Sequence, residues 1–302
     1  MPERSAHVVA QAKINLALRV LAREASGYHQ IETLLHRLEI GDSVRVRTGA
    51  RTDSLDCQGA DTGPVEQNLA MRAVRAYRTA GGWPAAVAIE IDKQVPVGGG
   101  LGGGSADAGA VLRCLDALSP HPLGTARLLA LAGSLGADVP FLTMEQPLVL
   151  AWGRGNRMLT LPSLPARDVV LGRSNTPVAT ADAYGWLAEL REGAASPGST
   201  VLDPVELSTW AGVAAIAVND FESAVFPRHA ESEAWRRDFD DVMRRNAAGP
   251  HAIALLCGSG ATVALVHEPG AALAERDRWR STGAAVLHTR TARSVVPVTV
   301  DE

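Results

Sequence analysis

The chain carries the tract Pro96-Val97-Gly98-Gly99-Gly100-Leu101-Gly102-Gly103-Gly104-Ser105-Ala106-Asp107, in which six of the seven positions from 98 to 104 are glycine. Glycine adopts positive φ readily and has no Cβ, so consecutive N–H groups can converge on one anion. An alternating apolar run at 87–91 precedes the tract, and a helical pattern begins at Ser105. That helix start adds free N–H groups and a positive dipole end. A flexible linker would not need a strand directly before it and a helix directly after it. The tract therefore predicts a phosphate-binding loop.

The tract does not fit the common nucleotide-binding patterns. A Walker A motif needs a Lys after its last glycine, and none follows here. Gly98, Gly100 and Gly103 match G-x-G-x-x-G, but that match is nearly automatic among so many glycines, and Pro96 interrupts the strand that a Rossmann unit needs. Neither the H-R-D nor the D-F-G motif of protein kinases occurs. A phosphate loop of another type is therefore expected.

Composition and charge bound the class of protein. The 302 residues suit two domains or one large α/β unit, and the apolar share of 46% is enough for a real core. The net charge is −4 without a dense Lys/Arg run, so no nucleic-acid partner is expected. No apolar run approaches the roughly 20 residues of a membrane span, and residues 1–11 lack a signal-peptide pattern. The scattered Cys57, Cys114 and Cys257 argue against a disulfide framework and favour the cytoplasm.

Hydrophobic periodicity predicts alternating strands and helices. The predicted strands lie at 14–20, 44–48, 87–91, 168–173, 252–257 and 261–266, and the predicted helices lie at 69–81, 105–118, 125–136, from 180 onward, and at 229–246. A polar stretch at 193–200 is expected to be a surface loop. The Pro-rich stretch at 159–167 is the expected boundary between two domains, 1–160 and 161–302.

The pattern P-x-G-G-G-L-G-G-G-S resembles the phosphate loop of the GHMP small-molecule kinases. Further segments, in the same order, narrow the resemblance to the members that phosphorylate 4-diphosphocytidyl-2-C-methyl-D-erythritol in non-mevalonate isoprenoid biosynthesis. These segments are Ala12-Lys13-Ile14-Asn15-Leu16, Gly27-Tyr28-His29, Leu135-Gly136-Ala137-Asp138-Val139-Pro140, Thr176-Pro177-Val178, Asn219-Asp220-Phe221-Glu222 and Gly258-Ser259-Gly260. The resemblance covers nearly the whole chain.

The resemblance implies a two-domain α/β (α+β) fold, with an N-terminal ribosomal-protein-S5-like domain and a C-terminal ferredoxin-like domain. It implies transfer of the γ-phosphoryl group of ATP, with Mg²⁺, to the 2-hydroxyl of the substrate. Asp138 would be the general base, and Lys13 would stabilise the developing alkoxide. Taken alone, Lys13 suits a solvated strand position, and Asp138 could cap the helix that follows it.

The same resemblance assigns binding residues. Those implied for ATP are Asn68, Leu69, Lys93, Pro96, Gly98, Gly99, Gly100, Leu101, Gly102, Gly103, Gly104 and Ser105. Those implied for the cytidine-diphosphate-bearing substrate are Asn15, Tyr28, His29, Thr176 and Tyr184. Thr180 and Tyr184 are the two alternatives for the second wall of the cytosine pocket. The turn at Gly258 is expected to support the site, and direct metal ligands and the oligomeric state stay unassigned.

Two other functions remain open on the sequence. One is a different GHMP kinase, acting on homoserine, mevalonate or a sugar, but Tyr28 and His29 would then have no base to bind. The other is a nucleotide-binding regulator without catalysis, which would be expected to lose Lys13 or Asp138, and both are present. The sequence departs from the family pattern at Gln11, where proline is usual.

Overall fold

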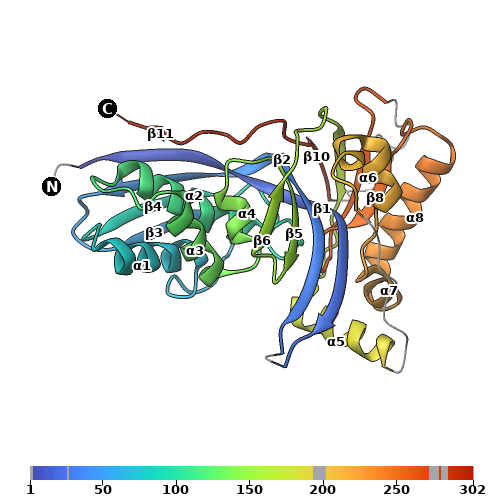
Figure 1. Ribbon diagram of the computed structural model, residues 1–302, viewed down its shortest axis with the longest axis horizontal. Helices are drawn as coiled ribbons and strands as arrows, with labels where there is room; N and C mark the ends of the chain where they lie inside the picture. Colours follow the sequence, from blue (N-terminus) through green and yellow to red (C-terminus); the bar gives the residue numbers. More distant parts are fainter. Residues whose placement is uncertain (1–2, 26, 193–201, 272–278, 280–284, 302) are drawn as a thin grey trace.

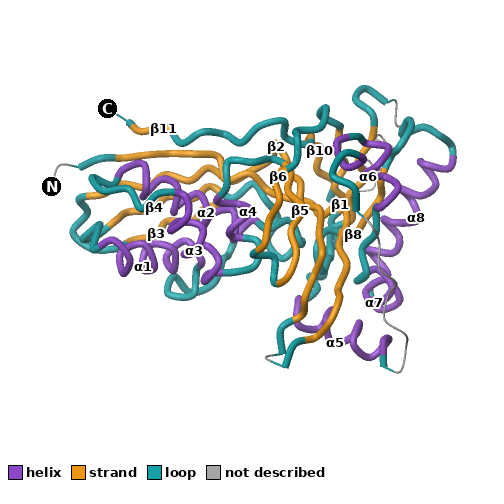
Figure 2. Tube along the Cα trace, in the orientation of Figure 1, coloured by secondary structure: helices purple, strands orange, loops and turns teal. Residues whose placement is uncertain are grey.

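The computed structural model describes residues 3–25, 27–192, 202–271, 279 and 285–301. Two β-sheets form the framework, and helices cover them (Figure 1, Figure 2). The strands of the first sheet are β1 (Ser5–Arg23), β2 (His29–Thr48), β3 (Ser54–Gln58), β4 (Val87–Asp92), β5 (Leu148–Gly153), β6 (Arg157–Thr160) and β11 (Thr299–Val300). The strands of the second sheet are β7 (Asp168–Gly172), β8 (Ile253–Leu256), β9 (Val263–His267) and β10 (Val286–Arg290).

The first sheet has the order β11-β1-β2-β4-β3, with β5 paired to β2 and β6 paired to β5, and the second has the order β10-β7-β9-β8. The antiparallel β1–β2 hairpin is long and runs from the first sheet past the second (Figure 1). Its residues Val8 and Ala10 belong to the core of the first sheet, whereas Ile14 and Leu16 share a core cluster with Val169 of β7. The hairpin therefore joins the two sheets through one continuous packed strand.

Helices cover one side of the first sheet (Figure 1). They are α1 (Leu69–Gly81), α2 (Gly103–Leu118), α3 (Thr125–Leu135) and the short α4 (Val139–Thr143). The three longer ones confirm the predicted helices, although α2 begins two residues before Ser105 because the last glycines of the tract form its first turn. The side chain of Asn68 caps α1 by accepting a hydrogen bond from the Ala70 N–H at 2.9 Å.

The second sheet is accompanied by α5 (Thr180–Arg191), α6 (Trp210–Ile216), α7 (Glu222–Val225) and α8 (Ala230–Arg244), with 3₁₀ turns at Glu206–Ser208 and Phe226–Arg228. The predicted helices at 180 and 229–246 and the predicted strands at 168–173, 252–257 and 261–266 are confirmed within a few residues. The predicted loop at 193–200 lies outside the described residues. Among the helices of the described residues, none combines the length and the apolar character needed to cross a membrane.

The end of the chain returns to the first sheet. After β10, the segment passes beside Gln11, whose side chain accepts a hydrogen bond from the Val296 N–H at 3.1 Å and donates one to the Ser294 carbonyl at 3.3 Å. β11 then pairs antiparallel with β1, and both termini lie at the same end of the molecule (Figure 1). Gln11, the residue that departs from the family pattern, thus holds this returning segment. The division at residue 160 stays a prediction, and β11 lies in the sheet of the first half.

Candidate functional site

The glycine tract forms a tight loop between β1, the start of α2 and the turn that follows β8. Gly98, Gly100 and Gly102 have φ values of 74°, 76° and 73°, a region that residues with a side chain rarely occupy. A Cβ on Gly100 would lie 1.8 Å from the carbonyl oxygen of Cys257. The Lys13 N–H donates a hydrogen bond to the Leu101 carbonyl at 3.0 Å. The fold therefore requires glycine here for close backbone packing.

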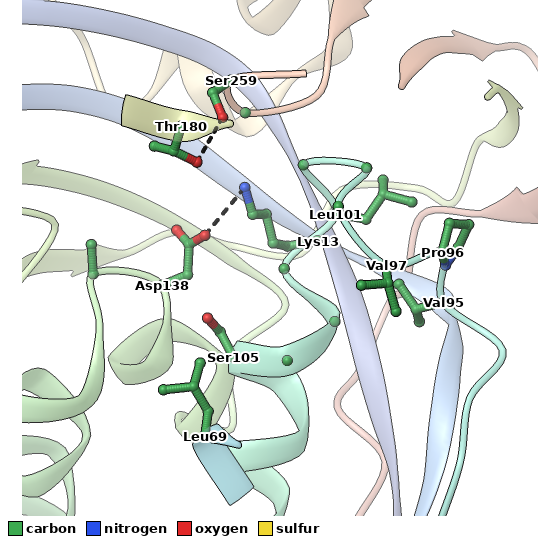
Figure 3. Close-up of a pocket in the computed structure, with 18 of the residues that line it drawn as sticks. Lys13, Leu69, Val95, Pro96, Val97, Leu101, Ser105, Asp138, Thr180 and Ser259 are labelled. Atoms are coloured by element: carbon green, nitrogen blue, oxygen red, sulfur yellow. Dashed lines mark hydrogen bonds and ion pairs between the residues drawn. The ribbon is translucent and has the colours of Figure 1, made fainter. Parts of the chain in front are cut away.

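The loop lines one side of a cavity of about 500 Å³, called here the loop cavity (Figure 3). Every residue predicted to bind ATP lines this cavity, namely Asn68, Leu69, Lys93, Pro96, Gly98, Gly99, Gly100, Leu101, Gly102, Gly103, Gly104 and Ser105. Lys13, Asn15, Asp138 and Tyr184 line the same cavity. In Figure 3, Ser105 points into this space from the start of α2. The structure thus brings the predicted nucleotide residues and the predicted catalytic pair together.

Lys13 and Asp138 point toward one another in the loop cavity (Figure 3). The Lys13 ammonium lies 3.4 Å from the Asp138 carboxylate, and it donates a hydrogen bond to the Asn15 side-chain oxygen at 2.8 Å. The pairing of β1 with β2 shifts register beside Lys13 and again beside Asn15. Such shifts re-aim side chains along a strand. They account for two polar residues pointing into a cavity from a strand that is otherwise buried in the core.

The side chain of Asn15 forms three buried hydrogen bonds. Besides the bond from Lys13, its oxygen accepts one from the Gly258 N–H at 3.1 Å, and its amide donates to the Thr33 hydroxyl at 2.8 Å. Because each of these bonds fixes the same amide orientation, the oxygen of Asn15 must face the ammonium of Lys13. The turn at Gly258 therefore supports the site through Asn15.

Asp138 occupies the N-cap position of α4, yet its side chain makes no capping hydrogen bond. The carboxylate points to Lys13 instead, and about a third of it is exposed, with a side-chain accessibility of 35%. The alternative that Asp138 simply caps a helix is therefore not what the structure shows. Across the Lys13–Asp138 pair from Ser105, the hydroxyls of Thr180 and Ser259 lie 3.0 Å apart (Figure 3).

A second cavity, of about 860 Å³, adjoins the first and is called here the hairpin cavity. Tyr28 and His29, at the tip of the β1–β2 hairpin, line it, and both cavities share the lining residues Ile31, Ala137, Thr180 and Tyr184. Ala137 directly precedes Asp138, so the two cavities meet beside the Lys13–Asp138 pair. A bound molecule that fills the hairpin cavity can thus reach the carboxylate of Asp138.

The aromatic side chains of the hairpin cavity are ordered by stacking. The His29 imidazole stacks on Tyr184, with ring centroids 4.5 Å apart, and Tyr184 packs edge-on against Phe221 at 4.8 Å. Burial lowers the pKa of His29, and the nearby charges of Arg23 and Arg191 add to that effect. Burial raises the pKa of Tyr184, with a further contribution from Asp138. Both Thr180 and Tyr184 line the hairpin cavity, and of these two residues Tyr184 is the one that contributes an aromatic ring.

Three of the predicted binding residues already have close partners within the protein: Lys93, Thr176 and Tyr28. The Lys93 ammonium is buried between Asp42 and Asp107, at 2.7 Å from the latter. Burial alone would lower the pKa of Lys93, but the two carboxylates outweigh it and raise that pKa. Thr176 is exposed and outside the lining of both cavities, and its carbonyl lies 2.9 Å from the His229 ring nitrogen. Tyr28 is 61% exposed, with the Arg154 guanidinium 4.4 Å from its ring centroid.

Several lining residues were not predicted from the sequence. Ser259 comes from the turn after β8, and Arg23, Arg72 and Arg154 line the hairpin cavity. Arg72 follows Asn68 by four positions, so helical spacing already placed both on neighbouring turns of one face. Arg154 lies in a turn between β5 and β6, strands that the sequence analysis did not predict, and no pattern pointed to it.

The fold, the glycine loop and the predicted catalytic pair define the class of the protein as a GHMP-type small-molecule kinase. The family model of the GHMP kinases N terminal domain matches residues 68–146. A crystal structure of 4-(cytidine 5'-diphospho)-2C-methyl-D-erythritol kinase is similar over 95% of this chain and 99% of its own, with a TM-score of 0.74 and 29% identity. Homoserine kinase from Cytophaga hutchinsonii superimposes over 100% of this chain and 98% of its own, with a TM-score of 0.65, but at 17% identity it shows the shared fold alone.

The 4-diphosphocytidyl-2-C-methyl-D-erythritol kinase of Deinococcus radiodurans is 37% identical to this chain over 290 residues, which are 93% of each protein. The chain belongs to the family of 4-diphosphocytidyl-2-C-methyl-D-erythritol kinases. It is accordingly an ATP-dependent kinase of small molecules, with the two-domain α/β fold of the GHMP kinases. These findings confirm the family, the fold and the enzyme class that the sequence predicted, and they do not favour the other GHMP substrates or a regulator without catalysis.

Proposed function

We propose that this chain transfers the γ-phosphoryl group of ATP to the 2-hydroxyl of 4-diphosphocytidyl-2-C-methyl-D-erythritol. One observation carries the proposal: the loop cavity and the hairpin cavity meet beside the Lys13–Asp138 pair. A phosphate donor in the first cavity and a long acceptor in the second would then bring their reacting ends to the same two side chains. Cavities of this size are typical of small-molecule sites.

In this proposal, Asp138 accepts the proton of the substrate 2-hydroxyl as the oxygen attacks the γ-phosphorus. A bond forms between that oxygen and the phosphorus, the bond to the β-phosphate oxygen breaks, and ADP leaves with the electron pair. Lys13 stabilises the negative charge on the attacking oxygen and on the γ-phosphoryl group. Asn15 holds the Lys13 ammonium in place through the 2.8 Å hydrogen bond. Phosphoryl transfer depends mainly on such positioning and charge neutralisation.

The glycine loop and the start of α2 would hold the ATP phosphates through backbone N–H groups. Mg²⁺ is expected to accompany the nucleotide and to neutralise part of the phosphate charge. The oxygens of Ser105 and Asp138, which line the loop cavity, are of the kind that this ion prefers. Asn68 and Leu69, at the start of α1, would border the adenosine part. The N-terminal segment 1–160 and the segment 161–302 are proposed as the two domains, and the cytoplasm stays the predicted compartment.

The cytosine is proposed to lie in the hairpin cavity, against Tyr28 and His29. The Tyr184 ring fixes the plane of His29 by stacking, so the imidazole edge is presented in a constant orientation. Homoserine, mevalonate and simple sugars carry no base that these rings could recognise. Tyr184 is therefore proposed as the second aromatic element of the pocket, in preference to Thr180.

The test is ADP release by the purified protein with ATP and Mg²⁺, comparing the cytidyl substrate with homoserine, mevalonate and galactose. Turnover with the cytidyl compound alone is the expected result. Turnover with another alcohol would keep the kinase class and overturn the proposed substrate. Tight ATP binding without turnover of any of the four would favour a regulator without catalysis.

A further inference from the structure

The two cavities differ in charge. The loop cavity is lined by two lysines and two aspartates, namely Lys13, Lys93, Asp107 and Asp138, so its ionic side chains balance. The hairpin cavity is lined by three arginines, and no Asp or Glu is among its described lining residues. The whole chain has a formal net charge of −4. A concentration of positive charge inside one cavity of an acidic protein indicates an anionic ligand.

The three arginines, Arg23, Arg72 and Arg154, are not equivalent. Arg154 forms an ion pair with Glu24, and its guanidinium covers the Tyr28 ring, so its charge is already partly compensated. Arg23 lies opposite His29 in the strand pairing at the tip of the hairpin, and its charge contributes to the lowered pKa of that imidazole. Among the residues that the structure describes, no carboxylate forms an ion pair with the side chain of Arg23 or Arg72.

Arg72 lines the hairpin cavity from a helix whose start lines the loop cavity. Helix α1 contributes Asn68 and Leu69 to the loop cavity, and one turn later it contributes Arg72 to the hairpin cavity. Gly136 and Ala137, which lead to Asp138, also line the hairpin cavity, and Ala137 lines both cavities. In the acceptor, the diphosphate stands between the cytidine and the methylerythritol that carries the reacting hydroxyl. A cation at this point faces the diphosphate when both ends are bound.

We infer that Arg72 binds the diphosphate of the cytidyl acceptor, an inference that rests on the proposed function. The planar guanidinium makes paired hydrogen bonds to phosphate oxygens, which a lysine cannot reproduce. Arg72 thereby selects acceptors that carry a phosphate bridge, and it sets the distance between the base pocket and Asp138. Arg23, opposite His29 in the hairpin, adds a second positive charge to the same cavity.

The experiment compares the binding of CDP and cytidine by titration calorimetry, with the loop cavity filled by a saturating non-hydrolysable ATP analogue. The wild-type protein is expected to bind CDP more tightly than cytidine. Arg72→Ala should weaken CDP binding by about tenfold to a hundredfold, the scale of charged hydrogen bonds, and leave cytidine binding unchanged. Arg72→Lys should recover part of the CDP affinity.

Arg75→Ala is the matched control, because Arg75 lies on the same helix, outside the lining of both cavities, with its guanidinium bonded to the Glu66 carbonyl at 2.8 Å. It should change neither affinity. Equal loss of CDP and cytidine binding in Arg72→Ala, or no loss, would overturn the inference, and thermal unfolding of each variant checks that it is folded.

Steady-state kinetics separate this inference from the proposed function. In Arg72→Ala the KM for the cytidyl acceptor should rise while the KM for ATP stays the same, and a rise in the KM for ATP instead would assign Arg72 to the nucleotide. If the wild-type protein prefers CDP to cytidine but phosphorylates no cytidyl acceptor, the proposed function fails and the binding role of Arg72 stands. If the wild-type protein turns over the acceptor but Arg72→Ala keeps the full preference for CDP, the inference alone fails.

Discussion

The Lys13 ammonium lies 3.4 Å from the Asp138 carboxylate, and the two come from distant parts of the chain: β1 and the start of α4. The lysine side chain is buried and the carboxylate is partly open to the cavity, with accessibilities of 4% and 35%. A third residue, Asn15, holds the ammonium from the other side at 2.8 Å. The cation is therefore fixed by the protein, whereas the carboxylate has a free side on which a substrate hydroxyl can bind.

Replacement of that carboxylate should stop the chemistry without removing the nucleotide site. Asp138→Asn keeps the size and the contact to Lys13 but cannot accept the proton, so kcat should fall about a hundredfold to ten-thousandfold. The affinity for ATP, measured by calorimetry, should change little because the glycine loop is intact. Asp61→Asn is the control, because the Asp61 carboxylate accepts a hydrogen bond from the Gly63 N–H and is outside the lining of both cavities. Retention of wild-type kcat in Asp138→Asn would exclude the carboxylate as the base.

The parts of the site that the sequence predicts are those carried by local patterns. The glycine tract encodes its own backbone geometry, and the helix after it follows from periodicity, so the loop was predictable from a dozen consecutive residues. β2 was predicted only at its end, because residues 33–38 are buried on both faces and include His36 and Arg37. Polar residues at buried positions break the alternation that identifies a strand.

The rest of the site depends on tertiary contacts, which no local pattern encodes. Buried Arg37 is accommodated because its guanidinium donates to the Phe141 and Met144 carbonyls, on a segment a hundred residues away. Similarly, Tyr184 meets His29 only because α5 packs beside the tip of the hairpin (Figure 1). The sequence left Thr180 and Tyr184 as alternatives for this wall, since both lie in the first turns of one helix.

The stacked pair of Tyr184 and His29 should govern acceptor binding. Tyr184→Leu keeps apolar volume but removes the ring, so the KM for the cytidyl acceptor should rise about tenfold while the KM for ATP stays the same. Tyr184→Phe keeps the ring and should remain close to wild type. Steady-state kinetics with each substrate varied in turn measure both effects. An unchanged acceptor KM in Tyr184→Leu would remove this ring from the pocket.

The close approach of Gly100 to the turn after β8 should make this glycine irreplaceable for stability. Gly100→Ala would place a methyl group 1.8 Å from the Cys257 carbonyl oxygen at a φ of +76°, so two backbones must separate. The cost should be about 3 kcal/mol or more in the free energy of unfolding. Gly104→Ala, inside α2, would place a methyl group 3.9 Å from its nearest neighbour, the Leu69 side chain, and should leave stability unchanged or slightly raised. Urea unfolding distinguishes the two variants, and equal stabilities would contradict the packing argument.

Buried His36 should make the protein sensitive to acid. Burial lowers the pKa of His36 to about 4, against an ordinary value of 6.5, despite the hydrogen bond to the Arg37 carbonyl at 2.8 Å. As pH falls from 6.5 to 4, His36 binds a proton in the unfolded chain but stays neutral in the folded protein. The folded state therefore loses about 3 kcal/mol of stability. His36→Phe removes this titration. It keeps an aromatic ring beside Trp210, where the His36 ring stacks at 6.0 Å, and the Arg37 carbonyl still accepts a hydrogen bond from the Ala292 N–H.

The free energy of unfolding, measured in urea at pH 7, 6, 5 and 4, should therefore fall less steeply in His36→Phe than in the wild-type protein. The free energy of unfolding of the wild type minus that of the variant should be nearly constant above pH 6.5 and should fall by about 3 kcal/mol toward pH 4. Comparison with the wild type cancels the contributions of other titrating groups, including His29, because both proteins retain them. Parallel curves over the whole range would mean that His36 takes up its proton at the same pH in the folded and unfolded states, and that its burial beside Trp210 does not exclude the charge.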